Sequence, residues 1–242
     1  MTEDTVFLLA YLVVVFLVAP LVVAAIVVPV FLREKKRSER LELQQKQQRQ
    51  QLQEAEILRT KLEEEKWQED IRTGKVDFVK AEALYNTGTM LLESGKYYEA
   101  IEQFTKAIDF NPRYKEAYCN RGIAYKKKGS CDKAIEDYNR ALKFGDDPDV
   151  HYNKGLALLE NKDFESARSA FHQAIHGLTD YNKKKPMALL NHGIASYNCS
   201  CRYNSIGSYY NAIYDWKEVL KIDPNNSEAQ RLIKMAEENR PY

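Results

Sequence analysis

The hydrophobic and polar positions divide the chain into three segments, and the first is apolar. Residues 5–32 carry no charged side chain, and the run Val6–Leu32 would cover roughly 40 Å as a helix, against about 30 Å of hydrocarbon in a bilayer. We expect this run to be a transmembrane helix in contact with lipid, in spite of Pro20 and Pro29. A cleaved signal peptide is the alternative, but such peptides begin with basic residues and have a shorter apolar stretch.

Basic residues follow the apolar run directly. They are Arg33, Lys35, Lys36, Arg37 and Arg40. Because positive charge is retained on the cytoplasmic side of a membrane, we expect these residues to flank the bilayer there. The sequence therefore predicts a single-pass integral membrane protein whose C-terminal part lies on the cytoplasmic, matrix or stromal side. The identity of the membrane stays open.

The second segment is charged and rich in glutamine. Residues 33–72 contain no Pro or Gly, and Glu, Gln, Lys, Arg and Leu, which dominate there, are good helix formers. The stretch QQKQQRQQ at 44–51 offers no apolar seam, so a sustained coiled coil is not predicted. We expect an exposed or partner-supported helix that ends near Gly74, and a partly disordered tether is the alternative. The domain boundaries that follow are 1–32, 33–76 and 77–242.

The third segment repeats the same pattern four times. Its glycines stand 34, 33 and 38 residues apart, and in each unit an alanine precedes an aromatic residue by four positions, which is one face of a helix. The three sets are Gly88, Gly122, Gly155 and Gly193; Ala100, Ala134, Ala167 and Ala212; and Phe104, Tyr138, Phe171 and Trp216. A single helical hairpin cannot bury such a face alone, so the units are expected to stack.

This pattern resembles the tetratricopeptide-repeat family, as in LYNTGTMLLESGKYYEAIEQFTKAIDFNP within residues 81–114. The resemblance implies an all-α superhelical solenoid of four helical hairpins followed by a capping helix. The units are expected at about 81–114, 115–147, 148–181 and 186–225, with the capping helix at 227–239. Ser227 is expected to cap that last helix. The fourth unit has extra residues around 200–208, which we expect to form an inserted loop between its two helices.

Composition and motifs argue against catalysis and against nucleic acid. The net charge of +1 provides no basic field for nucleic acid, and the four cysteines are too few and too irregular for a disulfide framework, so free thiols are predicted. We find no phosphate-binding loop, nucleophile elbow or paired Cys/His zinc pattern. His172 and His176 are spaced to share a metal ion, but no third ligand is in view. No catalytic residue, metal or cofactor is therefore predicted, and the chain is not expected to be an enzyme.

Four asparagines are the candidate binding residues. Asn86, Asn120, Asn153 and Asn191 each stand two residues before a repeat glycine. Each amide can donate to and accept from the backbone of an extended peptide, and the resemblance implies a groove for a peptide or protein partner that is lined by the first helix of each unit. The alternative is that asparagine is common at this position in such repeats, whatever they bind.

The resemblance also allows one partner class to be tested. Chaperone-binding members grip a C-terminal carboxylate with Lys and Asn from the first unit, Asn from the second, and Lys and Arg from the third. The corresponding residues here are Tyr85 and Thr89, then Asn120, then Asp149 and Asn153. Only Asn120 matches, and Asp149 would repel a carboxylate. An Hsp70 or Hsp90 carboxylate clamp is therefore not expected.

Two functions remain open on this evidence. The first is a membrane-anchored interaction scaffold that holds a peptide or protein partner in its groove, as a receptor or as an assembly factor of a membrane complex. The second is a permanent structural accessory subunit of such a complex. The first predicts transient partners, whereas the second predicts co-purification at a fixed stoichiometry.

Overall fold

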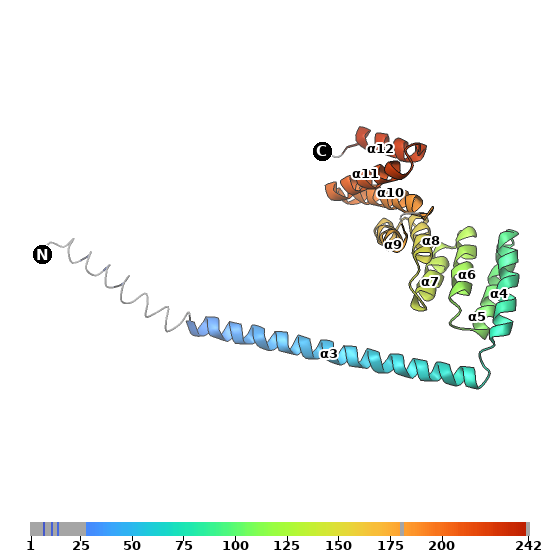
Figure 1. The fold of residues 1–242 in the computed structure, drawn as a ribbon. Helices are drawn as coiled ribbons and strands as arrows, with labels where there is room; N and C mark the ends of the chain where they lie inside the picture. Colours follow the sequence, from blue (N-terminus) through green and yellow to red (C-terminus); the bar gives the residue numbers. More distant parts are fainter. Residues whose placement is uncertain (1–6, 8–10, 12–13, 15–27, 180–181, 241–242) are drawn as a thin grey trace. The chain divides into compact units, whose positions relative to one another are not determined.

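A computed structural model of the chain describes residues 28–179 and 182–240, together with Phe7, Tyr11 and Val14 (Figure 1). In these residues the regular elements are helices, which confirms the predicted all-α class. The chain divides into one unit that ends at Asp70 and a second that spans Ile71–Tyr242.

The first unit contains α3, the helix Val28–Arg72. Every side chain from Arg33 to Lys66 is exposed, so this stretch of the helix packs against no other described part of the chain. Side-chain pairs one turn apart support it, for example Arg59 Nε to Glu63 Oε1 at 2.9 Å. The helix is followed by Gly74, whose φ is +71° and whose N–H donates to the Ile71 carbonyl at 3.1 Å.

The predicted membrane localisation is contradicted. No helix among the described residues is long and apolar enough to span a bilayer, because the long helix α3 carries charged or amide side chains along most of its length. Most of the run 5–32, on which that prediction rested, lies outside the described residues. The membrane-flanking role predicted for Arg33, Lys35, Lys36, Arg37 and Arg40, which are exposed on α3, loses its basis with it.

The second unit consists of four helical hairpins and a final helix, as the resemblance implied (Figure 1). The hairpins are α4 (Phe78–Glu93) with α5 (Tyr97–Phe110), α6 (Lys115–Lys127) with α7 (Cys131–Lys143), α8 (Pro148–Glu160) with α9 (Phe164–Gly177), and α10 (Lys185–Tyr203) with α11 (Ile206–Ile222), followed by α12 (Ser227–Glu238). The second helix of each hairpin packs on the first helix of the next: α5 on α6, α7 on α8 and α9 on α10. The last helix, α12, packs on α11.

Each hairpin closes where its glycine meets its aromatic ring. A Cβ atom on Gly88 would lie 2.7 Å from Phe104 Cε1, and one on Gly155 would lie 2.7 Å from Phe171 Cε1. The rings of Phe104, Tyr138, Phe171 and Trp216 have no exposed surface. The repeat glycines are therefore required because the ring occupies the volume that a larger side chain would need.

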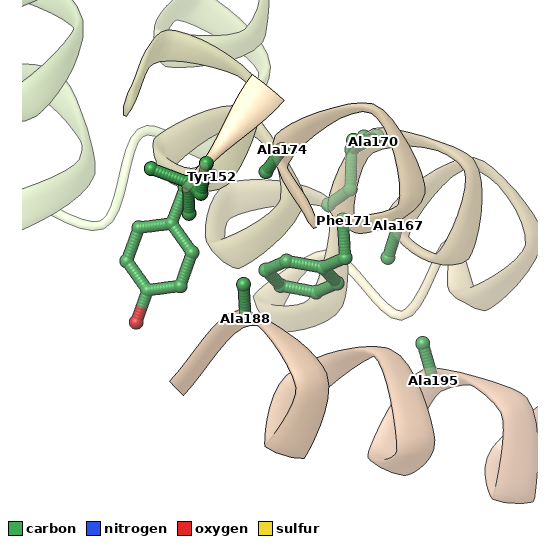
Figure 2. Packing of buried hydrophobic residues seen from close by; sticks show 9 residues of the cluster. Tyr152, Ala167, Ala170, Phe171, Ala174, Ala188 and Ala195 are labelled. Atoms are coloured by element: carbon green, nitrogen blue, oxygen red, sulfur yellow. The ribbon is translucent and has the colours of Figure 1, made fainter. Parts of the chain in front are cut away.

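The same rings also join successive hairpins. Figure 2 shows the ring of Phe171 between α9, which carries it, and the helix that carries Ala188 and Ala195. Both alanines are fully buried in the cluster that contains Phe171. Small residues on the next helix thus let α10 approach the ring closely, and apolar surface that one hairpin exposes is covered by its neighbour.

The fourth hairpin and the final helix differ from the prediction in two details. The extra residues around 200–208 do not form a loop, because they lengthen α10 to Tyr203 and let α11 begin at Ile206. Asn204, with φ of +49°, and Ser205, which accepts from the Ser208 N–H at 3.3 Å, make the tight turn between them. Helix α12 is capped by Asn226 rather than Ser227, since the Ala229 N–H donates to Asn226 Oδ1 at 3.0 Å.

Candidate functional site

The four predicted asparagines occupy equivalent places on the first helices of the hairpins. Asn86, Asn120, Asn153 and Asn191 lie on α4, α6, α8 and α10, and we call them the asparagine row. These helices contact one another in order, α4 with α6, α6 with α8 and α8 with α10. The row therefore runs across adjacent helices of one unit.

Asn120 joins two successive hairpins. Its Nδ2 donates to the Tyr85 hydroxyl at 3.1 Å, and the Thr89 hydroxyl lies 3.4 Å away, both on α4. Tyr85 is itself held by ring contacts with Phe104 and Tyr114, at centroid distances of 5.9 and 5.0 Å. Asn120 is thus oriented by the preceding repeat, and its Oδ1 is left to accept a hydrogen bond from a ligand.

Asn191 repeats this arrangement two hairpins further along. Its Nδ2 donates to the Met187 carbonyl at 2.9 Å and lies 3.5 Å from the Tyr152 hydroxyl on α8. The Tyr152 ring packs edge-on against Phe171 at 5.9 Å. A tyrosine on one first helix and an asparagine on the next therefore form a recurring pair, which fixes the geometry of these two members of the row.

The other two asparagines are less constrained. Asn86 is exposed and Asn153 is half-buried, and within the described residues neither donates to a neighbouring helix. In the second repeat Cys119 takes the place that Tyr85 and Tyr152 hold, so Asn153 has no phenol to meet. Burial raises the pKa of the Cys119 thiol to about 11. Asn86 and Asn153 are therefore the members of the row whose amides are most available to a partner.

Sequence reasoning found the asparagines but missed the tyrosines that orient two of them. The available signal was a Tyr–Asn dipeptide shortly before a repeat glycine, as at Tyr85–Asn86 before Gly88 and Tyr152–Asn153 before Gly155. Because each tyrosine bonds to the asparagine of the following repeat, and not to its own neighbour, the pairing depends on how the hairpins stack.

The structure also places the residues that were compared with a carboxylate clamp. Asp149 does not stand alone, because Lys184 Nζ lies 2.7 Å from its Oδ2. Asn120 is engaged with Tyr85 and Thr89, which are the two first-repeat residues of that comparison. The absence of an Hsp70 or Hsp90 clamp stays a prediction from the sequence.

The histidines form a cluster with a buried carboxylate. The rings of His172 and His176 lie 4.4 Å apart, His192 lies 6.0 Å from His172, and His192 Nδ1 is 2.6 Å from Asp215 Oδ2. In the described part of the chain, however, no three His, Cys, Asp or Glu residues are placed to hold a metal ion. Each of the four cysteines is a free thiol.

Comparison with known proteins agrees with this architecture. Family models described as TPR repeat or tetratricopeptide repeat match residues 88–129, 116–144 and 148–175. The chain carries tetratricopeptide repeats. These matches run from the middle of α4 to near the end of α9. The α10–α11 hairpin repeats the packing of a glycine, Gly193, against a buried aromatic ring, Trp216.

Two curated relatives illustrate the range of similar proteins. The photosystem I assembly protein Ycf3 of Rippkaea orientalis is 29% identical over 144 residues, which is 54% of this chain and 81% of that protein. The small glutamine-rich tetratricopeptide repeat-containing protein 2 of Mycosarcoma maydis is 31% identical over 100 residues, or 41% of this chain and 28% of that protein.

Solved structures show the same fold. The crystal structure of MamA superposes with a TM-score of 0.55 at 22% identity, covering 63% of this chain and 84% of MamA. Residues 41 to the end of MamA from Desulfovibrio magneticus RS-1 give a TM-score of 0.59 at 17% identity, over 66% of this chain and 85% of that one. At these identities the likeness concerns the fold alone.

Proposed function

We propose that this repeat unit is a scaffold that binds a protein partner, in the manner of an assembly factor that holds subunits of a larger complex. The observation that carries the proposal is the asparagine row. Asn120 and Asn191 are oriented by tyrosines of the preceding repeat, whereas the amides of Asn86 and Asn153 donate to no neighbouring helix within the described residues. An amide that both donates and accepts suits the backbone of an extended segment.

The relatives support the assembly role without naming the complex. The Ycf3 proteins are named for photosystem I assembly, and this chain covers 81% of one of them at 29% identity. We carry over only the class of role, which is the temporary holding of protein subunits. A permanent accessory subunit is the second candidate, and it differs in stoichiometry.

The architecture favours binding over catalysis as the role of this chain. Tetratricopeptide repeats and assembly-factor relatives point to a non-catalytic protein. The side chains of the asparagine row are amides, and two of them pair with tyrosine hydroxyl groups. An amide has neither the nucleophilicity that covalent catalysis requires nor a pKa suited to proton transfer.

Quantitative co-purification from the cells that make this protein tests the proposal. We expect the double variant N86A/N153A to lose the proteins that the wild type retains, because both amides face a ligand without holding neighbouring helices together. N211A is the matched control, since Asn211 is exposed on α11, away from the row. Unchanged partners in N86A/N153A would contradict the proposal.

The same experiment separates the two candidates. An assembly factor is expected to be recovered with its partners in less than equimolar amounts, and most strongly while new complexes are being made. An accessory subunit is expected at a fixed ratio in the finished complex at all times.

A further inference from the structure

A second set of equivalent residues forms pairs of a nitrogen base with a carboxylate inside two of the hairpins. One member stands immediately before the repeat glycine and the other immediately before the buried aromatic residue. In the second hairpin they are Arg121 and Asp137: Nε lies 2.8 Å from Oδ2 and Nη2 lies 2.7 Å from Oδ1. Arg121 Nη1 also donates to Thr105 of the first hairpin at 3.1 Å.

The fourth hairpin contains the corresponding pair. His192 stands before Gly193 and Asp215 before Trp216, and His192 Nδ1 lies 2.6 Å from Asp215 Oδ2. Both aspartates are almost completely buried, at 5% exposure for Asp137 and 6% for Asp215. At this place in the fold a nearly buried carboxylate is therefore accommodated when a nitrogen base on the first helix faces it.

The third hairpin keeps the base but lacks the acid. Lys154 stands before Gly155, whereas the residue before Phe171 is Ala170. Burial lowers the pKa of Lys154, and no neighbouring carboxylate counters that shift. Among the residues that the structure describes, Lys154 makes neither a hydrogen bond nor an ion pair. A half-buried ammonium group without a counter-charge is unfavourable unless something else supplies one.

Lys154 lines an open cleft. The cleft has a volume of about 410 Å³ and lies between α7, α8 and α9. Around Lys154 it offers hydroxyl and amide side chains, namely Asn139, Ser166, Ser169 and Gln173. Ala170, where the second and fourth hairpins have aspartate, is part of the same wall, and it precedes Phe171 on α9 (Figure 2).

The other ionisable groups of the cleft are already engaged. His151 Nε2 lies 2.7 Å from Asp146 Oδ1, and Asp163 Oδ1 accepts from the Ser166 N–H at 3.2 Å as the cap of α9. Neither carboxylate appears among the groups that perturb Lys154. Asp163 keeps its negative charge at the start of α9, but it does not act on Lys154. Among the described residues the ammonium group of Lys154 therefore has no counter-charge, and the cleft also contains hydroxyl and amide groups that can donate hydrogen bonds.

We infer that this cleft binds the carboxylate of an aspartate or glutamate side chain that a partner protein inserts beside Lys154. The inserted carboxylate takes the place that Asp137 and Asp215 hold in the neighbouring hairpins, and Ala170 leaves the room for it. We assign an aspartate or glutamate side chain because the groups that fill the equivalent places are aspartate carboxylates, each facing a nitrogen base.

This cleft is distinct from the asparagine row. Lys154 follows Asn153 on α8, and successive residues of a helix point about 100° apart, so the two side chains leave α8 in different directions. The inference goes beyond the proposed function and does not depend on it, because loss of binding at the row would leave the charge at Lys154 unchanged.

Nuclear magnetic resonance of the full chain with labelled lysine tests the inference. The probes are two capped pentapeptides, Ala-Ala-Glu-Ala-Ala and its Gln counterpart, and inorganic phosphate. We expect the Glu peptide to shift the Lys154 side-chain signal saturably, with a dissociation constant of about 1–10 mM, and to raise the pKa of Lys154. The Gln peptide is expected to do neither. Equal responses to Glu and Gln, or a stronger response to phosphate than to Glu, would overturn the assignment.

Two variants complete the test. In A170D the introduced carboxylate is expected to raise the pKa of Lys154 without any peptide and to abolish the response to the Glu peptide. With uniform nitrogen-15 labelling, the amide signals of Ser166 and Ser169 in K154M are expected to stop responding to the Glu peptide. In K234M, at an exposed lysine on α12, the same signals are expected to keep their response. A peptide response that survives K154M would overturn the inference, even if A170D did not fold.

Discussion

The backbone of Gly122 lies directly against the ring of Tyr138, so that a Cβ atom at Gly122 would come within 2.8 Å of Tyr138 Cε1. This contact joins the two helices of one hairpin, α6 and α7. The ring that makes it is fully buried, and the same relationship recurs in the other three hairpins. The repeat glycines therefore recur along the sequence at the spacing of one packing contact that each hairpin makes.

The first prediction concerns that contact. G122A should destabilise the protein by about 1–3 kcal/mol, because the added methyl group overlaps a buried ring that has no room to move. Urea denaturation measures the change. The control is G207A on α11, where an added Cβ meets nothing within 4 Å and no loss of stability is expected. Equal losses in the two variants would show that the ring contact is not the cause.

The ion pair between Arg121 and Asp137 should contribute more than the surface pairs. The two side chains are only 15% and 7% exposed, and burial raises the pKa of Asp137 against the opposing effect of Arg121. D137N leaves the guanidinium without a counter-charge, so we expect a loss of about 3–5 kcal/mol in the free energy of unfolding. E102Q, which breaks the exposed pair of Glu102 with Lys106, is expected to change little. A small effect of D137N would mean that water replaces the carboxylate.

Stability should fall in acid partly through Asp147. Burial raises the pKa of this carboxyl. The hydrogen bonds from Lys115 Nζ, at 2.8 Å, and from the Asp149 N–H lower the pKa by a larger amount, so the pKa lies below its usual value. Ionised Asp147 therefore stabilises the folded state above its unfolded pKa, and this contribution is lost as the pH falls through the folded pKa. D147N, which keeps a capping side chain on α8, should show a smaller loss of stability between pH 7 and about pH 3. Parallel pH profiles for the two proteins would contradict this assignment.

The thiols should differ in reactivity. With a pKa of about 11, Cys119 has about a thousandth of its population as thiolate at pH 8, and it is partly covered, whereas Cys201 is exposed. We expect a disulfide reagent to label Cys201 first and Cys119 only slowly, as measured by mass spectrometry of the peptides. The variant C201S should remove the fast phase, and fast labelling of Cys119 would mean that α6 opens readily.

The sequence predicted the fold well where the evidence was periodic. The spacing of Gly88, Gly122, Gly155 and Gly193 follows from contacts inside single hairpins, which recur with the chain and can be read along it. The pairing of Asn120 with Tyr85 was not predicted, because it joins residues 35 positions apart whose approach depends on the stacking of hairpins. The role of Lys154 was not predicted either, because its lack of a facing aspartate appears only when its hairpin is compared with the neighbouring hairpins.

Two local predictions failed for reasons of helix geometry. Extra residues around 200–208 were expected to form a loop, but the tight turn at Asn204–Ser205 joins two helices that extend to Tyr203 and from Ile206. The choice between Asn226 and Ser227 as the cap of α12 depends on which side chain reaches the Ala229 N–H. Both residues are favourable caps, and composition alone does not separate them.

Photo-crosslinking from the asparagine row tests the central claim most directly. A photoreactive amino acid is placed at Asn153, on the row, or at Asn211, on α11, and the protein is irradiated in the cells that make it. The account predicts that the protein substituted at Asn153 crosslinks to the partner that co-purifies with the wild type, and that the one substituted at Asn211 does not. Crosslinks to that partner from Asn211 alone would contradict the claim that the first helices of the repeats hold it.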